Sequence, residues 1–249
     1  MTYTEAIEKQ FGTRCWVNNP TLAQAEQAIR ANVNYCTTNP AYCAKLLQSD
    51  APYIKAVIQR VKSGNDIQTA KNVVNQISKD LMAVFLPVFA ATGGQAGFVT
   101  VQQDPRKEED RAYSLEATLE SAACGRNLMA KIPVTEDGLW LIAEMVKHNI
   151  PICATEVFAV DQAVAVWRCY EDASKRYGHK PPVYITHITG IMDDYFKDAA
   201  VREAIGISDE ALAIAGTSVA YEIFRKLAEL GFKGRMLGGG ARKLAHYDN

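Results

Sequence analysis

The chain has 249 residues, a length that suits one α/β barrel domain or two small domains. Hydrophobic residues make up 48% of it and charged residues 22%, which are ordinary values for a globular protein with a sizeable core. The net charge of -1, from 27 basic and 28 acidic residues, gives no electrostatic reason to expect a nucleic-acid partner or a membrane surface.

Neither a membrane span nor a secretion signal is expected. The longest apolar run, residues 81–91, is about half of the roughly 20 residues that a spanning helix needs. The N-terminal sequence MTYTEAIEKQF lacks the apolar centre of a signal peptide. The cysteines form no CxxC pair and the histidines have no ligand spacing, so we expect a cytoplasmic protein with free thiols and with no metal or other cofactor.

Strand and helix patterns alternate along the chain, which favours a parallel sheet covered by helices. The predicted strands are residues 13–17, 33–36, 97–102, 127–132, 150–157, 183–188 and 235–237. The predicted helices are residues 22–32, a segment after Pro40, 51–82, 110–123, 135–148, 161–177, 193–205 and 209–230. No repeat or linker divides the chain, so residues 1–249 are expected to form a single domain.

The strand count is one short of a closed (β/α)8 TIM barrel, and only nine residues follow Gly240. We therefore expect a barrel that is incomplete at its C-terminus. An open sheet edge is prone to association. Either something unusual covers the edge, or a partner chain supplies the eighth strand.

Lys131 lies near the end of the hydrophobic strand at residues 127–132, on the same face as Met129. If it faced the helices, its buried charge would be costly. If it faced the lumen, it would lie where barrel enzymes place their active sites, and a lowered pKa would allow the amine to form an imine. The alternative is a lysine whose stem follows the strand end while its ammonium group reaches solvent.

Three segments resemble the transaldolase and fructose-6-phosphate aldolase family, in that family's order and at its strand ends. They are T-T-N-P at 37–40, A-K-I-P-V-T-E-D-G-L at 130–139 and A-T-E-V-F-A-V-D-Q-A at 154–163. Weaker similarities are T-G-I-M-D-D at 189–194 and L-G-G-G-A-R at 237–242. The resemblance covers residues 18–242 and implies a class I aldolase, which forms a Schiff base with its substrate, on a transaldolase-type TIM barrel.

The resemblance also implies roles for individual residues. Lys131 would attack the carbonyl of a ketose, and Thr155 would handle protons together with an acidic residue and a water molecule. Further catalytic positions are Gln102 and Asn18, and the substrate-binding positions are Thr37, Asn39, Thr186 and Arg242. Thr186 would lie near the phosphate-binding end, and Arg242 would meet the anionic end of the substrate.

Four positions depart from the family pattern: Asn18 replaces an aspartate, Cys153 an asparagine, Ile191 a phosphate-binding arginine, and Gln102 the glutamate of transaldolases. Gln102 is what fructose-6-phosphate aldolases carry. An amide cannot exchange a proton at neutral pH, so another group must replace Asn18. The candidates are Asp104, Glu156, His187 and Tyr184. The loss of one cation favours a substrate less anionic than a sugar phosphate.

Three smaller features have a structural interpretation as well as a functional one. Strand alternation puts His187 on the opposite face from Thr186, which favours a packed, helix-facing histidine. Asp193 and Asp194 are typical of a solvated helix start rather than a metal site. The glycines at 238–240 could cradle a phosphate through their N–H groups or form a flexible strand end.

The sequence is compatible with two functions. The first is a transaldolase-like enzyme acting on a small carbonyl or sugar substrate, by C–C bond cleavage or by transfer of a three-carbon unit. The second is a catalytically silent or partner-dependent subunit of a heteromeric complex. A homo-oligomer, or a hetero-oligomer with a chain that completes the barrel, is expected in place of a lone monomer.

Overall fold

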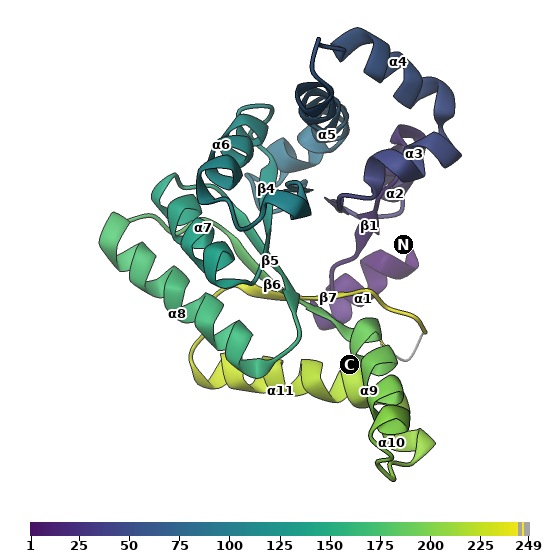
Figure 1. Ribbon diagram of the computed structural model, residues 1–249, viewed down its shortest axis with the longest axis vertical. Helices are drawn as coiled ribbons and strands as arrows, with labels where there is room; N and C mark the ends of the chain where they lie inside the picture. Colours follow the sequence, from purple (N-terminus) through teal and green to yellow (C-terminus); the bar gives the residue numbers. More distant parts are fainter. Residues whose placement is uncertain (244–245, 247–249) are drawn as a thin grey trace. The chain divides into compact units, whose positions relative to one another are not determined.

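The structure is a computed structural model that describes residues 1–243 and 246 (Figure 1). The chain forms two compact units, Met1–Ala130 and Lys131–Asn249. That the two units act as one barrel domain remains a prediction.

The described strands follow one another in a single sheet in chain order, from β1 to β7. They are β1 (Trp16–Asn18), β2 (Tyr35–Thr37), β3 (Val99–Gln102), β4 (Leu128–Pro133), β5 (Ile152–Val157), β6 (Val183–Ile188) and β7 (Arg235–Gly239). The pairs β1–β2, β2–β3, β5–β6 and β6–β7 are parallel. Helices alternate with these strands, so the fold is that of a (β/α)8 barrel in which seven strands are present.

The helices of the first unit are α1 (Tyr3–Phe11), α2 (Leu22–Arg30), α3 (Tyr42–Ser49), α4 (Ala51–Val61), α5 (Asp66–Ala91), the 3₁₀ turn η1 (Pro105–Lys107) and α6 (Arg111–Ala122). Those of the second unit are α7 (Glu136–Lys147), α8 (Val160–Tyr177), α9 (Thr189–Arg202), α10 (Asp209–Ala213) and α11 (Ala215–Glu229).

In the first unit, α5 is the central helix. Among the described helices it is the one long and apolar enough to cross a membrane by length and composition alone. However, it packs against α2, α4, α6 and β3, and it buries Ile77, Leu81 and Phe85 almost completely. Lys71 on the same helix forms an ion pair with Glu120 of α6 at 2.9 Å. These contacts are those of a core helix.

In the second unit, β5 and β6 are buried on both faces, as expected for parallel strands under helices. Figure 1 shows α7 and α8 side by side, and α11 packs against α8 and α9. Ile142 and Met145 of α7 and Val166 of α8 are fully buried. This packing covers β5 and β6, whose buried side chains include the polar residues Thr155 and Thr186.

The structure confirms the seven predicted strands with shifts of one to three residues at some ends. Helix α1 was not expected. The apolar stretch 83–91 belongs to α5, which continues through Pro87, and the segment 209–230 is divided into α10 and α11 at Ile214.

Candidate active site

Lys131 is the fourth residue of β4, between the buried residues Ala130 and Ile132. Burial lowers the pKa of its amine below the ordinary lysine value, and electrostatic interactions with Cys153 and Glu156 partly oppose that shift. A lysine with a lowered pKa keeps a larger fraction of its amine uncharged, which is the nucleophilic form.

The turn after Lys131 is held by short-range contacts that the sequence motif explains. Thr135 caps α7 by accepting a hydrogen bond from Gly138 N–H at 3.0 Å. A Cβ atom on Gly138 would lie 1.9 Å from the carbonyl oxygen of Pro133, so only glycine allows helix α7 to start this close to β4. The backbone after β4 is therefore fixed.

β4 and β5 are joined at their carboxyl ends. Val134 N–H donates to the carbonyl oxygen of Thr155 at 3.0 Å. Gln162 of α8 donates to the carbonyl oxygen of Val134, and its own side-chain oxygen accepts from the N–H groups of Phe158 and Ala159. Gln162 thus ties the two loops that follow Lys131 and Thr155.

Three polar side chains of β5 and β6 are buried. Thr155 and Thr186 are 1% and 4% exposed, and Cys153 is fully buried. The Cys153 Sγ atom and the Thr186 Oγ1 atom form a hydrogen bond of 3.2 Å in which either can donate. Burial raises the pKa of the Cys153 thiol, and Lys131 and Thr186 act against that shift. Cys153 is therefore a neutral thiol beside the lysine.

Glu156 follows Thr155 in an unusual backbone conformation. Its φ angle is 60°, in the left-handed region that a residue with a Cβ atom rarely adopts, and the pairing of β5 with β6 shifts register between Ala154 and Val157. The side chain is exposed and interacts electrostatically with Lys131. Strained residues at bulges are often found at functional sites.

His187 faces the helices, as strand alternation predicted. It is fully buried, with Nδ1 at 2.9 Å from the carbonyl oxygen of Val157 and Nε2 at 3.0 Å from that of Gly216. Burial lowers the pKa of the imidazole, and these two contacts partly oppose that shift. With both ring nitrogens engaged by backbone atoms, His187 has a packing role.

Close packing on β6 explains two of the three glycines at 238–240, whereas a Cβ atom on Gly238 would meet no atom within 4 Å. Gly239 lies against the side chains of Thr186 and Ile188, and a Cβ atom on Gly240 would come within 2.7 Å of Ile188. Gly240 also has a φ angle of 64°. The chain then turns over the first turn of α9, where a Cβ atom on Gly190 would lie 2.5 Å from Arg242 Cγ. This turn presents Arg242, whose side chain is about half exposed.

The polar groups of the first unit lie where β2 and β3 end. Thr100 Oγ1 donates to Thr37 Oγ1 at 3.0 Å and accepts from Thr38 N–H, while Thr38 Oγ1 donates to the Thr100 carbonyl oxygen. This network orients the Thr37 hydroxyl. Gln102, at the end of β3, is 8% exposed.

Asn19, which the sequence analysis did not single out, links β1 to β2. Its N–H donates to the carbonyl oxygen of Thr37, and its side-chain oxygen accepts from Asn39 N–H at 3.2 Å. Its φ angle of 51° turns the chain out of β1. Asn18 is exposed, and the Asn39 side chain caps the start of the next turn by accepting from Ala41 N–H.

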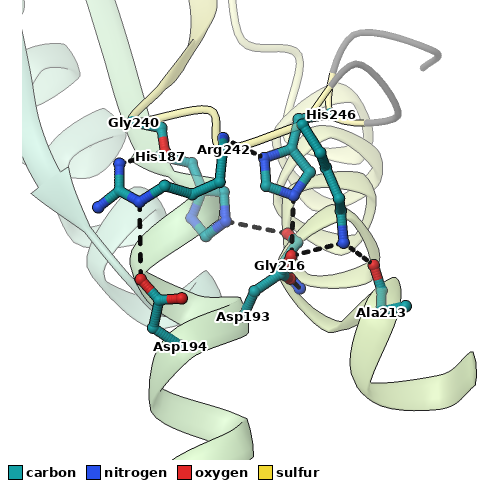
Figure 2. Close-up of polar contacts among 9 residues, drawn as sticks. His187, Asp193, Asp194, Ala213, Gly216, Gly240, Arg242 and His246 are labelled. Atoms are coloured by element: carbon teal, nitrogen blue, oxygen red, sulfur yellow. Dashed lines mark hydrogen bonds and ion pairs between the residues drawn. The ribbon is translucent and has the colours of Figure 1, made fainter. Parts of the chain in front are cut away.

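The expectation that Asp193 belongs to a solvated helix start is wrong. Helix α9 begins at Thr189, so Asp193 lies a full turn inside it and is 3% exposed. Its Oδ1 atom accepts from Gly216 N–H at 2.9 Å, and its Oδ2 atom lies 2.8 Å from both His246 Nε2 and Lys243 Nζ (Figure 2). Asp194 is exposed and lies 3.6 Å from Arg242 Nε.

Comparison with known protein families shows to which family the chain belongs. The family described as Transaldolase/Fructose-6-phosphate aldolase matches residues 15–247. The chain belongs to this family.

Among curated relatives, a transaldolase of Trichodesmium erythraeum (strain IMS101) is 24% identical over 213 residues, covering 78% of this chain and 56% of the relative. A transaldolase of Mycobacterium ulcerans (strain Agy99) is 25% identical over 206 residues, covering 78% of this chain and 55% of the relative. The chain therefore spans about half the length of these relatives.

Proposed function

We propose that the chain is a transaldolase-like class I aldolase in which Lys131 forms a Schiff base with a ketose or another small carbonyl compound. The observation that carries this proposal is the partly buried amine of Lys131, whose pKa is lowered, on a strand joined to the one that bears Thr155. Membership of the transaldolase/fructose-6-phosphate aldolase family supports the same reaction class.

The proposed reaction passes through an iminium ion and an enamine. The Lys131 amine adds to the carbonyl carbon, and loss of water gives an iminium ion. The bond between the third and fourth carbons breaks as the hydroxyl on the fourth carbon loses its proton, and the electron pair passes to the iminium nitrogen. An aldehyde leaves and an enamine remains. The enamine attacks an acceptor aldehyde, or it takes up a proton, and water then releases the amine.

Glu156 is the best of the four candidates for the proton transfer that Asn18 cannot perform. Asp104 is held in a hydrogen-bonded ion pair with Arg106 at 2.7 Å, and His187 is engaged by two backbone carbonyls. Tyr184 is buried near the start of β6, at the opposite end of the strand from its carboxyl end. Glu156 has an ionisable side chain that interacts with Lys131, adjacent to Thr155 in the chain. A carboxylate at this point can take the hydroxyl proton and return it.

In this proposal Thr155 assists the proton transfer, while Thr186 and Arg242 bind the substrate. Asn18, Thr37, Asn39 and Gln102 belong to the first unit, and their roles toward the substrate stay predictions. The six free cysteines suit a soluble enzyme of the cytoplasm. No cofactor takes part in these steps, since the lysine itself provides the electron sink.

The test is irreversible reduction of the imine. The protein would be incubated with fructose or dihydroxyacetone and borohydride, digested, and analysed by mass spectrometry. The expected adduct is on Lys131, and the Lys131→Met variant should lack it. Lys147→Met, which removes an exposed lysine paired with Glu144, is the matched control and should keep the adduct. Absence of an adduct across a panel of ketoses would remove the proposal.

A second function is a partner-dependent subunit, in which another polypeptide completes the sheet. It is favoured by β7, which stands at the end of the strand order and carries exposed residues at Arg235 and Gly238. Large apolar side chains are exposed on α9 and α11 and at the junction of α10 and α11, namely Tyr195, Val201, Ile214, Tyr221 and Phe224. Such an edge and such side chains suit a protein partner. A monodisperse, active monomer in light-scattering and adduct experiments would exclude this function.

A further inference from the structure

A buried polar cluster fixes the segment that carries Arg242 (Figure 2). Its centre is the Asp193 carboxylate, which accepts hydrogen bonds from Gly216 N–H, His246 Nε2 and Lys243 Nζ. The Asp193 and His246 side chains are 5% and 1% exposed. These residues come from α9, from the first turn of α11 and from the segment after β7, so the carboxylate joins three parts of the unit.

The two ring nitrogens of His246 have opposite hydrogen-bonding roles. Arg242 N–H donates to Nδ1 at 3.1 Å, so Nδ1 must carry a lone pair. The ring proton is therefore on Nε2, which donates to Asp193 Oδ2 at 2.8 Å. In this tautomer both ring nitrogens are satisfied. His246 thus connects the Asp193 carboxylate to the backbone of Arg242.

The Arg242 side chain makes two further contacts. Its Nη1 atom donates to the carbonyl oxygen of Gly240 at 3.0 Å, and Nε lies 3.6 Å from Asp194. The contacts of the guanidinium group within the described residues use Nε and Nη1, and the group is about half exposed. A fixed backbone and two fixed nitrogens leave the Nη2 edge to meet a ligand oxygen.

We propose that Asp193, His246 and Lys243 are positioning residues that hold Arg242 for the anionic end of the substrate. This inference rests on the proposed function. The anion would be a phosphate or carboxylate group on the ketose, since a planar guanidinium recognises both. Lys243 neutralises Asp193 inside the cluster, so Arg242 is the cation presented to the ligand and Asp194 is the group that competes with the anion for it.

Two different substitutions of His246 can each remove one of the two hydrogen bonds that its imidazole makes. In His246→Gln the side-chain amide can still donate to Asp193, but it has no acceptor at the place of Nδ1. In His246→Asn the side-chain oxygen can still accept from Arg242 N–H, but the link to Asp193 is lost. Cooperative thermal melts would establish that both variants fold. Lys243→Met, matched by Lys226→Met on the exposed face of α11, is a milder alternative.

The affinity for fructose 6-phosphate would be measured by calorimetry in a Lys131→Met background, in which imine formation cannot contribute. Arg242→Met, His246→Gln and His246→Asn are each expected to weaken binding about tenfold, a loss of about 1.4 kcal/mol. Because His246 acts through Arg242, the double variant Arg242→Met/His246→Gln should bind no more weakly than Arg242→Met alone. Lys226→Met should bind as the background protein does.

In the protein that retains Lys131, adduct formation from unphosphorylated fructose should change less than the affinity for fructose 6-phosphate. Unchanged binding in both His246 variants, or losses that simply multiply in the double variant, would overturn the inference. Failure to trap any adduct on Lys131 is a different result. It would sink the proposed function and leave the calorimetric comparison to judge the positioning role on its own.

Discussion

The Sγ atom of Cys153 lies 3.2 Å from the Oγ1 atom of Thr186, so a thiol and a hydroxyl meet on the face shared by β5 and β6. Burial keeps this thiol protonated at neutral pH, because its pKa is raised. Cys153 would favour the charged form of Lys131 only as a thiolate, so at neutral pH the acidic group that opposes the lowering of the lysine pKa is Glu156. The thiol and the hydroxyl are polar but uncharged groups near a partly buried amine, which is a suitable environment for a nucleophilic lysine.

Replacing Lys131 with methionine should raise thermal stability while abolishing the borohydride adduct. The folded pKa of Lys131 is below the ordinary value, so the penalty for burying its charge is fully present below the folded pKa. The penalty shrinks as pH rises from that point and vanishes above the ordinary pKa of about 10.4. The melting temperatures of the wild type and Lys131→Met should therefore converge as pH rises from the lowered folded pKa of Lys131 to its ordinary value. A constant difference would contradict the assigned burial.

Glu156→Gln should preserve the adduct on Lys131 but lower turnover by about a hundredfold, since the amide cannot transfer the proton. Glu156→Gly removes the same carboxylate and also relieves the left-handed backbone, which should stabilise the fold by about 1 kcal/mol. Urea denaturation and single-turnover assays separate the two effects. Equal stability of the two variants would show that the bulge is not strained.

Asp193→Asn should destabilise the protein by about 2 kcal/mol at neutral pH, because a buried carboxylate with three donors is lost. Burial raises the pKa of Asp193, but the hydrogen bonds from Lys243, Gly216 and His246 outweigh it and hold the pKa below its usual range. The stabilisation is therefore present above the ordinary pKa and is lost as pH falls through the folded pKa. Acid titration of both proteins should show their stabilities converging only at low pH.

Gly138→Ala should destabilise the protein by about 3 kcal/mol, because the new methyl group would meet the Pro133 carbonyl oxygen at 1.9 Å. The turn after β4 would have to move, so the rate of adduct formation on Lys131 should fall as well. Gly206→Ala is the matched control: no atom lies within 4 Å of its added Cβ, and its effect should be near zero. Denaturant titration measures both.

The strand pattern of the sequence was sufficient to predict β4, β5 and β6, because buried parallel strands form continuous apolar runs. Alternation along β6 also predicted correctly that His187 faces the helices. The N-terminal helix α1 was missed although its sequence carries start and stop signals: Thr2 and Glu5 form a capping box, and Gly12 ends the helix in the left-handed conformation.

The parts that could not be predicted depend on contacts between distant residues. The three donors to Asp193 lie 23, 50 and 53 positions further along the chain, and no local spacing indicates such a cluster. The left-handed conformation of Glu156 likewise has no sequence signal, because glutamate gives no hint of a positive φ angle.

Gly216 donates its N–H to Asp193 and receives His187 on its carbonyl oxygen. One residue at the start of α11 thus contacts His187 of β6 and Asp193 of α9, and Asp193 in turn binds the segment after β7. Adding or deleting a residue at Ile214 would rotate both backbone groups by about 100° around the helix and disconnect both partners at once. The length of the α10–α11 junction should therefore tolerate far less variation in homologous proteins than its exposed position suggests.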